Sequence, residues 1–147
     1  MQRPELRNAS LDDLQDVLAL LRGCELLESG VAEALGDFLV ARSDEELLGC
    51  AGLEVYGEVG LLRSVAVAER ARKSGLGRRL VESMATSGAH RGLRELYLLT
   101  TTAPTFFGRM GFVPVTRDLV PAGIATSWEF RTGCPRTALA MRLSLGD

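Results

Sequence analysis

Residues 61–84 read Leu-Leu-Arg-Ser-Val-Ala-Val-Ala-Glu-Arg-Ala-Arg-Lys-Ser-Gly-Leu-Gly-Arg-Arg-Leu-Val-Glu-Ser-Met. This stretch is typical of a buried strand, a short basic loop with two glycines, and an amphipathic helix. The first turn of a helix has backbone N–H groups without intrahelical partners, and the helix dipole adds positive potential there. The order of these elements therefore predicts an anion-binding loop after a core strand, of the kind that holds phosphate groups.

The composition of the chain limits the classes of protein to consider. Its 147 residues predict a single domain covering positions 1–147, and the net charge of -2 without a basic block gives no reason to expect a nucleic-acid partner. No apolar run approaches the roughly 18–20 residues of a membrane span, and the first residues lack the apolar core of a signal peptide. Three cysteines and one histidine show no metal-ligand spacing, so we expect no metal, no disulfide framework and a cytoplasmic location.

Hydrophobic periodicity and turn residues predict the elements along the chain. Ser10 and Asp13 have the spacing of an approximate capping box before a helix over residues 11–22. The strands are expected at 5–9, 37–42, 47–56, 59–67, 93–100, 112–115 and 137–145. Further helices are expected at 31–35, from 76 to about 88, at 104–109 and after Pro121.

The order of these elements predicts an α/β domain built on one mixed sheet. Strands 37–42 and 47–56 are joined by a short polar turn and should form an antiparallel hairpin. Strand 93–100 follows a crossover helix, so it should run parallel to strand 59–67.

Three types of phosphate-binding loop can be compared with the glycine loop. A P-loop requires G-x-x-x-x-G-K-[ST], and no part of the chain fits it. A dinucleotide-binding fingerprint would start at Gly75, but Leu80 occupies its third glycine position. The third pattern, [QR]-x-x-G-x-[GA], is met by Arg72-Lys-Ser-Gly75-Leu-Gly77 directly after the core strand.

With that loop the chain resembles the GCN5-related N-acetyltransferase (GNAT) family over nearly its whole length. The resemblance is carried by Val65-Ala-Val67, by Arg72-x-x-Gly75-x-Gly77, and by Phe106-Phe-Gly-Arg-Met-Gly-Phe112 with Ala103 before it. It implies the GNAT fold, a mostly antiparallel sheet with helices on both faces and a parallel pair of strands that splay apart. It also implies that acetyl-CoA is the cofactor.

The family's cofactor contacts can be placed on matching positions of this sequence. Glycine at 75 and 77 allows close approach of the backbone to phosphate oxygens, and the neighbouring basic residues add positive charge. The resemblance implies further contacts through the main chain of the preceding strand and through the helix near position 106. The predicted cofactor-binding residues are Val65, Ala66, Val67, Arg72, Lys73, Ser74, Gly75, Leu76, Gly77, Arg78, Phe106 and Phe107.

Acetyl transfer to an amine requires a base for the amine and a proton for the leaving thiolate. Many GNAT relatives have a tyrosine as the acid where this chain has Phe107, so the proton must come from water, a backbone N–H or another side chain. Glu54 and Glu58 are the nearby carboxylates, and Glu54 is the preferred base, acting directly or through water. The alternative, of equal weight, is that this carboxylate is only a solvated residue at a strand edge or turn. Ser64 is grouped with Glu54 as a catalytic candidate.

Arg63 interrupts an apolar strand, where a charge is costly unless it is paired. One interpretation is that its planar fork binds a carboxylate of the substrate. The alternative is a salt bridge to Glu54 or Glu129. The chain also resembles the small N-acetyltransferases encoded in arsenic-resistance operons and, distantly, the acetyltransferase domain of N-acetylglutamate synthases, which implies an acidic, amino-acid-like acceptor. The predicted acceptor-site residues are Arg63, Thr100, Glu129 and Arg131, with Thr101, Ser127 and Cys134 as further candidates.

The sequence thus predicts an N-acetyltransferase that moves the acetyl group of acetyl-CoA to the primary amine of a small amino-acid-like acceptor, by direct attack in a ternary complex. Two alternatives remain open. One is a protein or peptide N-terminal acetyltransferase, and the other is a catalytically silent coenzyme A sensor, which the phenylalanine at position 107 keeps in consideration. The expected partner is a small-molecule amine, with a homodimer as a further expectation.

Overall fold

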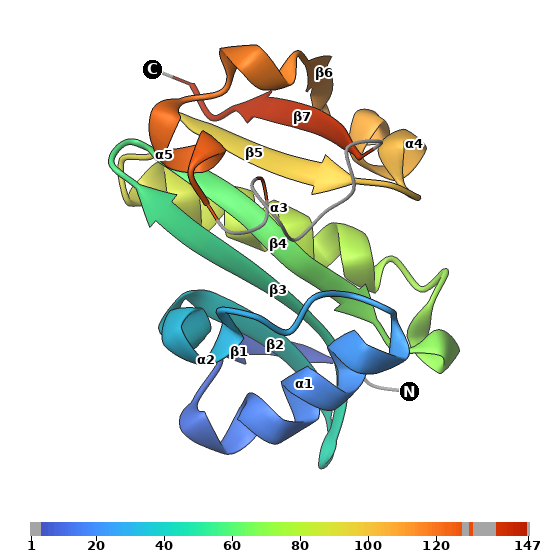
Figure 1. Ribbon diagram of the computed structural model, residues 1–147. Helices are drawn as coiled ribbons and strands as arrows, with labels where there is room; N and C mark the ends of the chain where they lie inside the picture. The colour runs from blue at the N-terminus through green and yellow to red at the C-terminus, as the bar shows by residue number, and fades with distance from the viewer. Residues whose placement is uncertain (1–3, 128–129, 131–137, 147) are drawn as a thin grey trace. The chain divides into compact units, whose positions relative to one another are not determined.

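The structure is a computed structural model that describes residues 4–127, 130 and 138–146. Within these residues seven strands form one sheet in the order β1-β2-β3-β4-β5-β7-β6 (Figure 1). Strand β4 runs parallel to β5, whereas β1–β2, β2–β3, β5–β7 and β6–β7 are antiparallel pairs, which confirms the predicted mixed, mostly antiparallel sheet. The strands are β1 (Glu5–Asn8), β2 (Phe38–Ser43), β3 (Glu46–Tyr56), β4 (Val59–Val67), β5 (Glu95–Thr100), β6 (Val113–Val115) and β7 (Leu139–Ser144).

The α-helices among the described residues are α1 (Leu14–Gly23), α2 (Val31–Ala34), α3 (Leu76–His90), α4 (Pro104–Arg109) and α5 (Ala122–Ala125). Short 3-10 turns cover Leu11–Asp13, Leu35–Asp37, Glu69–Ala71 and Arg117–Leu119. The predicted helix at 104–109 and the short helices near positions 31 and 121 are confirmed.

Helix α3 continues past Gly88, where the sequence predicted its end. Gly88 is a residue of the helix itself. A glycine suits this position because an added Cβ would lie only 3.3 and 3.4 Å from methyl carbons of Leu145 and Leu93. The residue that ends the helix is Gly92, with φ of +87°. The Leu93 N–H then donates to the Gly88 carbonyl at 2.9 Å, as in a Schellman motif.

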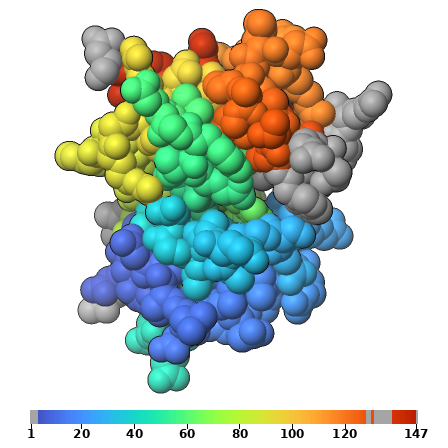
Figure 2. Space-filling model, turned by 60° about the vertical axis from the view of Figure 1, so that its left-hand side comes forward, coloured from blue at the N-terminus to red at the C-terminus, as the bar shows by residue number. Residues whose placement is uncertain are grey.

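The chain divides into two compact units, and strands β3 and β4 and helix α3 each contribute to both. The first unit comprises Met1–Glu54 and Arg63–Met84. In its core, Cys50 of β3 lies on the side of α1 and α2, whereas a Cβ on the adjacent Gly49 would meet Leu80 of α3 at 2.9 Å. Because successive strand residues point to opposite faces, helices cover both faces of the sheet in this unit. In Figure 2 the part of the chain that includes α1 and α2, coloured from blue to cyan, forms one continuous surface.

The second unit comprises Val55–Leu62 and Ala85–Asp147. Tyr97 of β5 packs with Leu61, Val120 and Ile124 beneath α5, while the adjacent Leu96 lies on the side of Gly88 in α3. Helices therefore cover both faces of the sheet in this unit as well. No helix among the described residues has the length and apolar character needed to cross a membrane.

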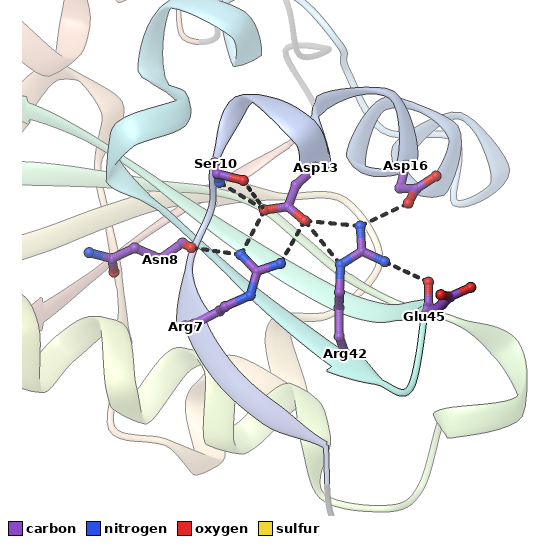
Figure 3. Close-up of polar contacts among 7 residues, drawn as sticks. All are labelled: Arg7, Asn8, Ser10, Asp13, Asp16, Arg42 and Glu45. Carbon is purple, nitrogen blue, oxygen red and sulfur yellow. Dashed lines mark hydrogen bonds and ion pairs between the residues drawn. The ribbon is translucent and has the colours of Figure 1, made fainter.

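A buried carboxylate ties the start of α1 to the first two strands (Figure 3). Asp13 accepts hydrogen bonds from Arg7 at 2.8 and 2.9 Å and from Nε of Arg42 at 3.0 Å. It also accepts from the Ser10 backbone N–H at 2.7 Å. This is one of the two hydrogen bonds that define the capping box predicted from the sequence. The Arg7 hydrogen bonds, helped by Ser10 and Arg42, hold the pKa of Asp13 well below its usual range. This network turns the chain from β1 into α1 and explains why a 3-10 turn precedes the helix.

Candidate functional site

Strand β4 is kinked at Ser64, whose φ of +59° lies in the left-handed region that residues other than glycine rarely adopt. Two contacts support this conformation. The Ser64 hydroxyl accepts a hydrogen bond from Nε of Arg63 at 2.9 Å, and its carbonyl accepts one from the Cys50 thiol at 3.3 Å. Such contacts offset the cost of a strained backbone, which is often retained at functional sites. The kink directly precedes Val65–Val67, the segment predicted to contact the cofactor.

The Arg63 side chain is buried, with 4% exposure, and donates to three different acceptors. Besides Ser64, it donates from Nη1 to Oε2 of Glu54 at 2.7 Å and from Nη2 to the Leu27 carbonyl at 3.4 Å. The salt bridge to Glu54 that the sequence offered as an alternative is confirmed. The Glu54 side chain is 20% exposed and therefore remains reachable from solvent. Carboxylate binding by Arg63 and a basic role of Glu54 stay predictions.

Gly30 packs directly against this ion pair. Its φ is +80°, and a Cβ at this position would lie 3.0 Å from Nη1 of Arg63 and 3.8 Å from Oε2 of Glu54. Sequence reasoning did not single out Gly30 or Leu27. A glycine immediately before the apolar start of a short helix was the available signal, but its neighbour Arg63 lies 33 positions away, and no local pattern could reveal that contact.

The loop after β4 folds back on the end of the strand. Arg72 donates from Nε to the Val67 carbonyl at 3.1 Å and from Nη2 to the Cys24 sulfur at 3.6 Å. Lys73 and Gly75 both have left-handed φ values, +66° and +86°. Arg72 therefore fixes the exit from β4 with its side chain, and the two positive-φ residues turn the backbone into α3.

Ser74 joins the loop to the first turn of α3. Its hydroxyl donates to the Ala71 carbonyl and accepts from the Leu76 N–H, the latter at 3.3 Å. At the next turn the Arg79 N–H donates to the Gly75 carbonyl at 3.0 Å, so the helical pattern begins at Gly75. The loop thus delivers the N-terminus of a 15-residue helix directly after the end of β4.

This loop fits a phosphate-bearing group. A Cβ at Gly75 would meet nothing within 4 Å, so the backbone there faces open space. The first N–H groups of a helix have no intrahelical acceptors, and the dipole of a long helix favours an anion beside them. Arg78 pairs with Glu82 at 3.1 Å, but both side chains are more than half exposed, and such a pair binds weakly enough to release the guanidinium.

Two thiols lie against β4. The Cys50 thiol is buried, and that burial raises its pKa to about 12. Cys24, at the C-terminal end of α1, is half-buried, and its thiol lies 3.9 Å from the Val67 carbonyl that Arg72 also contacts. At neutral pH the Cys50 thiol is therefore protonated and belongs to the core, which argues against a nucleophilic role for it.

In the second unit, helix α4 positions three of the predicted residues. The Thr100 hydroxyl accepts from the Ala103 N–H at 3.0 Å and so supports the turn into α4. Phe107 is buried between Phe106 and Phe112 in edge-to-face contacts, with ring centroids 5.0 and 5.7 Å apart. A phenylalanine here packs the helix onto the following strand and donates no proton. An acceptor role for Thr100 stays a prediction.

Two of the predicted acceptor residues, Glu129 and Arg131, lie outside the described residues, as does Cys134. Ser127 is buried, and its hydroxyl donates to the Ile124 carbonyl at 2.7 Å at the end of α5. The part of the chain that the structure describes has no cluster of three His, Cys, Asp or Glu residues suited to a metal ion. The first unit therefore contains the group Glu54, Arg63 and Ser64 and also the loop 72–78, and the second contains Thr100, Phe106 and Phe107.

Comparison with known families decides which of the phosphate-loop patterns applies. The family model for the acetyltransferase (GNAT) domain matches residues 34–114, which include β4, the glycine loop, α3 and α4. The chain belongs to the GNAT acetyltransferase family. The predicted family and its fold, inferred from Val65–Gly77 and the Phe106–Phe112 run, are confirmed.

Individual relatives agree with this assignment. An uncharacterized N-acetyltransferase of Chlorobaculum tepidum is 30% identical over 139 residues, which cover 89% of this chain and 87% of that protein. The amino-acid acetyltransferase of Escherichia coli K12 is 32% identical over 126 residues, 80% of this chain, but the match spans only 28% of the enzyme. N-acetylglutamate synthase of Neisseria gonorrhoeae, solved with coenzyme A and N-acetyl-glutamate, has the same fold at a TM-score of 0.88 and 22% identity, over 100% of this chain and 36% of that chain.

Proposed function

We propose that this protein transfers the acetyl group of acetyl-CoA to the primary amine of a small amino-acid-like acceptor, by direct attack in a ternary complex. The observation that carries the proposal is the loop after β4, in which Gly75 faces open space at the N-terminus of α3 within a GNAT-family chain. Acetyl-CoA supplies an activated acetyl group as a thioester. The remaining work, which is binding, orientation and proton movement, falls to the residues of the chain.

On the cofactor side, we assign the pyrophosphate to the N–H groups of the loop and of the first turn of α3. The main chain of Val65–Val67 holds the rest of the cofactor near the kink at Ser64, and Phe106 and Phe107 are further residues assigned to the cofactor. The Arg72 side chain stabilises this arrangement, because its guanidinium donates to the Val67 carbonyl. The residues assigned to the cofactor are those predicted from the sequence, positions 65–67, 72–78, 106 and 107.

On the acceptor side, Glu54 is the proposed base. Its carboxylate is fixed by Arg63 yet partly exposed, which suits a group that takes a proton from an incoming amine, directly or through one water. Ser64 stays a catalytic candidate beside it, and Thr100 a residue for the acceptor. The small acceptor is supported by the E. coli amino-acid acetyltransferase and by the N-acetyl-glutamate in the N. gonorrhoeae enzyme, although the chain matches only part of each.

The test is release of free thiol from acetyl-CoA in the presence of a panel of amines. The panel contains the common amino acids, their amides, arsenical and phosphinic amino-acid analogues, and short peptides with free N-termini. We expect thiol release to depend on an amino acid or an amino-acid analogue. Turnover of peptides alone indicates an N-terminal acetyltransferase, and tight acetyl-CoA binding without turnover of any amine indicates a sensor, which the absent tyrosine at position 107 favours.

The loop assignment has its own test. Gly75→Ala places a Cβ at φ of +86°, and we expect the KM for acetyl-CoA to rise roughly tenfold, because strain of this kind costs about 1–3 kcal/mol. Gly57→Ala is the matched control, since Gly57 has φ of +65° and also faces open space, but it lies in the β3–β4 turn. Equal effects of the two variants on the KM would contradict a role of the loop in binding.

A further inference from the structure

We propose that Arg63 is a positioning residue, which holds Glu54, the Ser64 kink and the α1–α2 connection in one arrangement. This inference rests on the proposed function, because it assigns how the reaction site is kept in shape. It differs from a carboxylate-binding role for the same guanidinium, in which Arg63 would touch the acceptor itself.

Each of the three guanidinium nitrogens donates one hydrogen bond within the chain. The single proton on Nε goes to the Ser64 hydroxyl, and both terminal nitrogens already donate to acceptors of the protein, at Glu54 and at the Leu27 carbonyl. An arginine that receives a substrate carboxylate offers two parallel N–H groups to it. Arg63 instead spends its nitrogens on three separate acceptors, with a side chain that is 4% exposed.

Those three acceptors belong to different segments of the first unit. Leu27 lies in the connection between α1 and α2, Glu54 in β3, and Ser64 in β4 itself. The Arg63 side chain therefore positions the proposed base Glu54, the β4 backbone just before Val65–Val67, and the connection between α1 and α2. Small displacements of such groups lower the rate of reaction more than the affinity for substrate, because catalysis depends on alignment.

Gly30 is the counterpart of Arg63 in this arrangement. A Cβ at Gly30 would stand 3.0 Å from Nη1, so the guanidinium would have to shift slightly to accept it. The left-handed φ of +80° is a second reason for glycine. If the proposal is right, the first reason disappears when Arg63 is shortened, while the second remains.

The first experiment compares Arg63→Lys with the wild type on two acceptors that differ only in a carboxylate, an amino acid accepted by the wild type and its amide. A lysine keeps the charge beside Glu54 but cannot reach three acceptors at once. We expect kcat to fall by about 10–100-fold with both acceptors, while the KM for either changes less than threefold. A rise in KM confined to the acceptor with the carboxylate, with kcat retained, would overturn the proposal in favour of direct binding.

The second experiment is a double-mutant cycle of Gly30→Ala and Arg63→Lys. Gly30→Ala is expected to lower kcat in the wild-type background and to lower it at least threefold less in the Arg63→Lys background, because the Cβ no longer meets the guanidinium. Gly92→Ala is the control for backbone strain alone, since Gly92 has φ of +87° and nothing within 4 Å. Additive effects of the two substitutions contradict the proposed coupling.

The third experiment needs no turnover and so separates this proposal from the proposed function. Hydrogen exchange of the backbone amides at Leu26 and Val31, which donate to the Leu21 and Glu28 carbonyls, reports on the α1–α2 connection. We expect exchange at least tenfold faster in Arg63→Lys and unchanged in Arg22→Gln, which removes only an exposed pair with Glu28. Unchanged exchange in Arg63→Lys overturns the positioning role even if acetyl transfer is demonstrated.

Discussion

Asp13 and Glu54 are both ion-paired with arginine in the first unit, and they differ in how completely the chain encloses them. Asp13 is 2% exposed and accepts from two arginines and from Ser10, so both of its oxygens are used inside the protein. Glu54 is 20% exposed and is held by Arg63 through Oε2. The first arrangement fixes a chain turn, whereas the second fixes a carboxylate and leaves part of it reachable from solvent.

This difference teaches that a carboxylate–arginine ion pair can serve two purposes, depending on how far the carboxylate is buried. An enclosed carboxylate such as Asp13 fixes the geometry of the chain, and its removal leaves Arg7 and Arg42 without their shared charge partner. A partly exposed pair holds a group that can still meet another molecule. Substitutions at the two carboxylates should therefore differ in their effect on activity.

The largest effect is expected from Asp13→Asn. The amide keeps the shape but leaves Arg7 and Arg42 without a charge partner, and we expect a loss of about 3 kcal/mol in the free energy of unfolding, measured by urea denaturation at pH 7. The rate of acetyl transfer per folded molecule should remain within twofold of the wild type. Asp16→Asn, at the more exposed partner of Arg42, serves as the control and should cost less than about 1 kcal/mol.

Glu54→Gln should lower the rate of acetyl transfer, which Asp13→Asn leaves nearly unchanged. We expect kcat to fall by about 10²-fold or more, because the amide cannot accept the amine proton. The free energy of unfolding should also fall, by about 3 kcal/mol, because the Arg63 side chain is 4% exposed and loses its charge partner. Single-turnover measurement with saturating acetyl-CoA checks the rate. Full activity in this variant would remove Glu54 as the base and direct attention to water.

The dependence of stability on pH should distinguish the two carboxylates further. The pKa of Asp13 is held below its ordinary value of 3.8, so its contribution to stability is complete above that value and is lost as pH falls below it. Between pH 7 and pH 3 the stability difference between the wild type and Asp13→Asn should shrink by about 1 kcal/mol. A constant difference over this range would mean that Asp13 titrates normally in the folded protein.

The smallest effect is expected from Ser10→Ala. This change removes the hydroxyl that contacts Asp13 at 3.2 Å but keeps the backbone N–H at 2.7 Å, so we expect a loss of about 0.5–1 kcal/mol in the free energy of unfolding. Thermal unfolding followed by circular dichroism measures it. A loss as large as that of Asp13→Asn would assign the turn to the hydroxyl and not to the arginine pairs.

Local patterns predicted most of the fold. The hydrophobic runs of β4 and β5 and the glycine loop between β4 and α3 carry their structure in a few adjacent residues, and the structure confirms them. The end of α3 was misplaced because Gly88 and Gly92 look alike in sequence. The structure places Gly88 inside the helix, where an added Cβ would lie close to Leu93, Leu96 and Leu145.

The candidate site was predictable to the extent that its chemistry is local. The cost of a buried charge indicated Glu54 or Glu129 as a partner of Arg63, and the structure shows Glu54, nine positions away on the preceding strand. The contacts of Arg63 with Leu27 and Gly30, and of Arg42 with Asp13, join segments about 30 residues apart. No spacing rule connects such positions, since their proximity is created by the sheet and the turns between them.

Cys24 offers a site for attaching a probe next to the glycine loop. Its half-buried thiol touches Arg72, while Cys50 remains protonated with a pKa of about 12. In a Cys134→Ser background a maleimide dye should therefore label Cys24 in preference to Cys50. A fluorophore attached there would sit next to the first residue of the loop, and its emission would give a direct optical titration of ligand binding. The affinity of the loop for acetyl-CoA could then be measured before any acceptor is known.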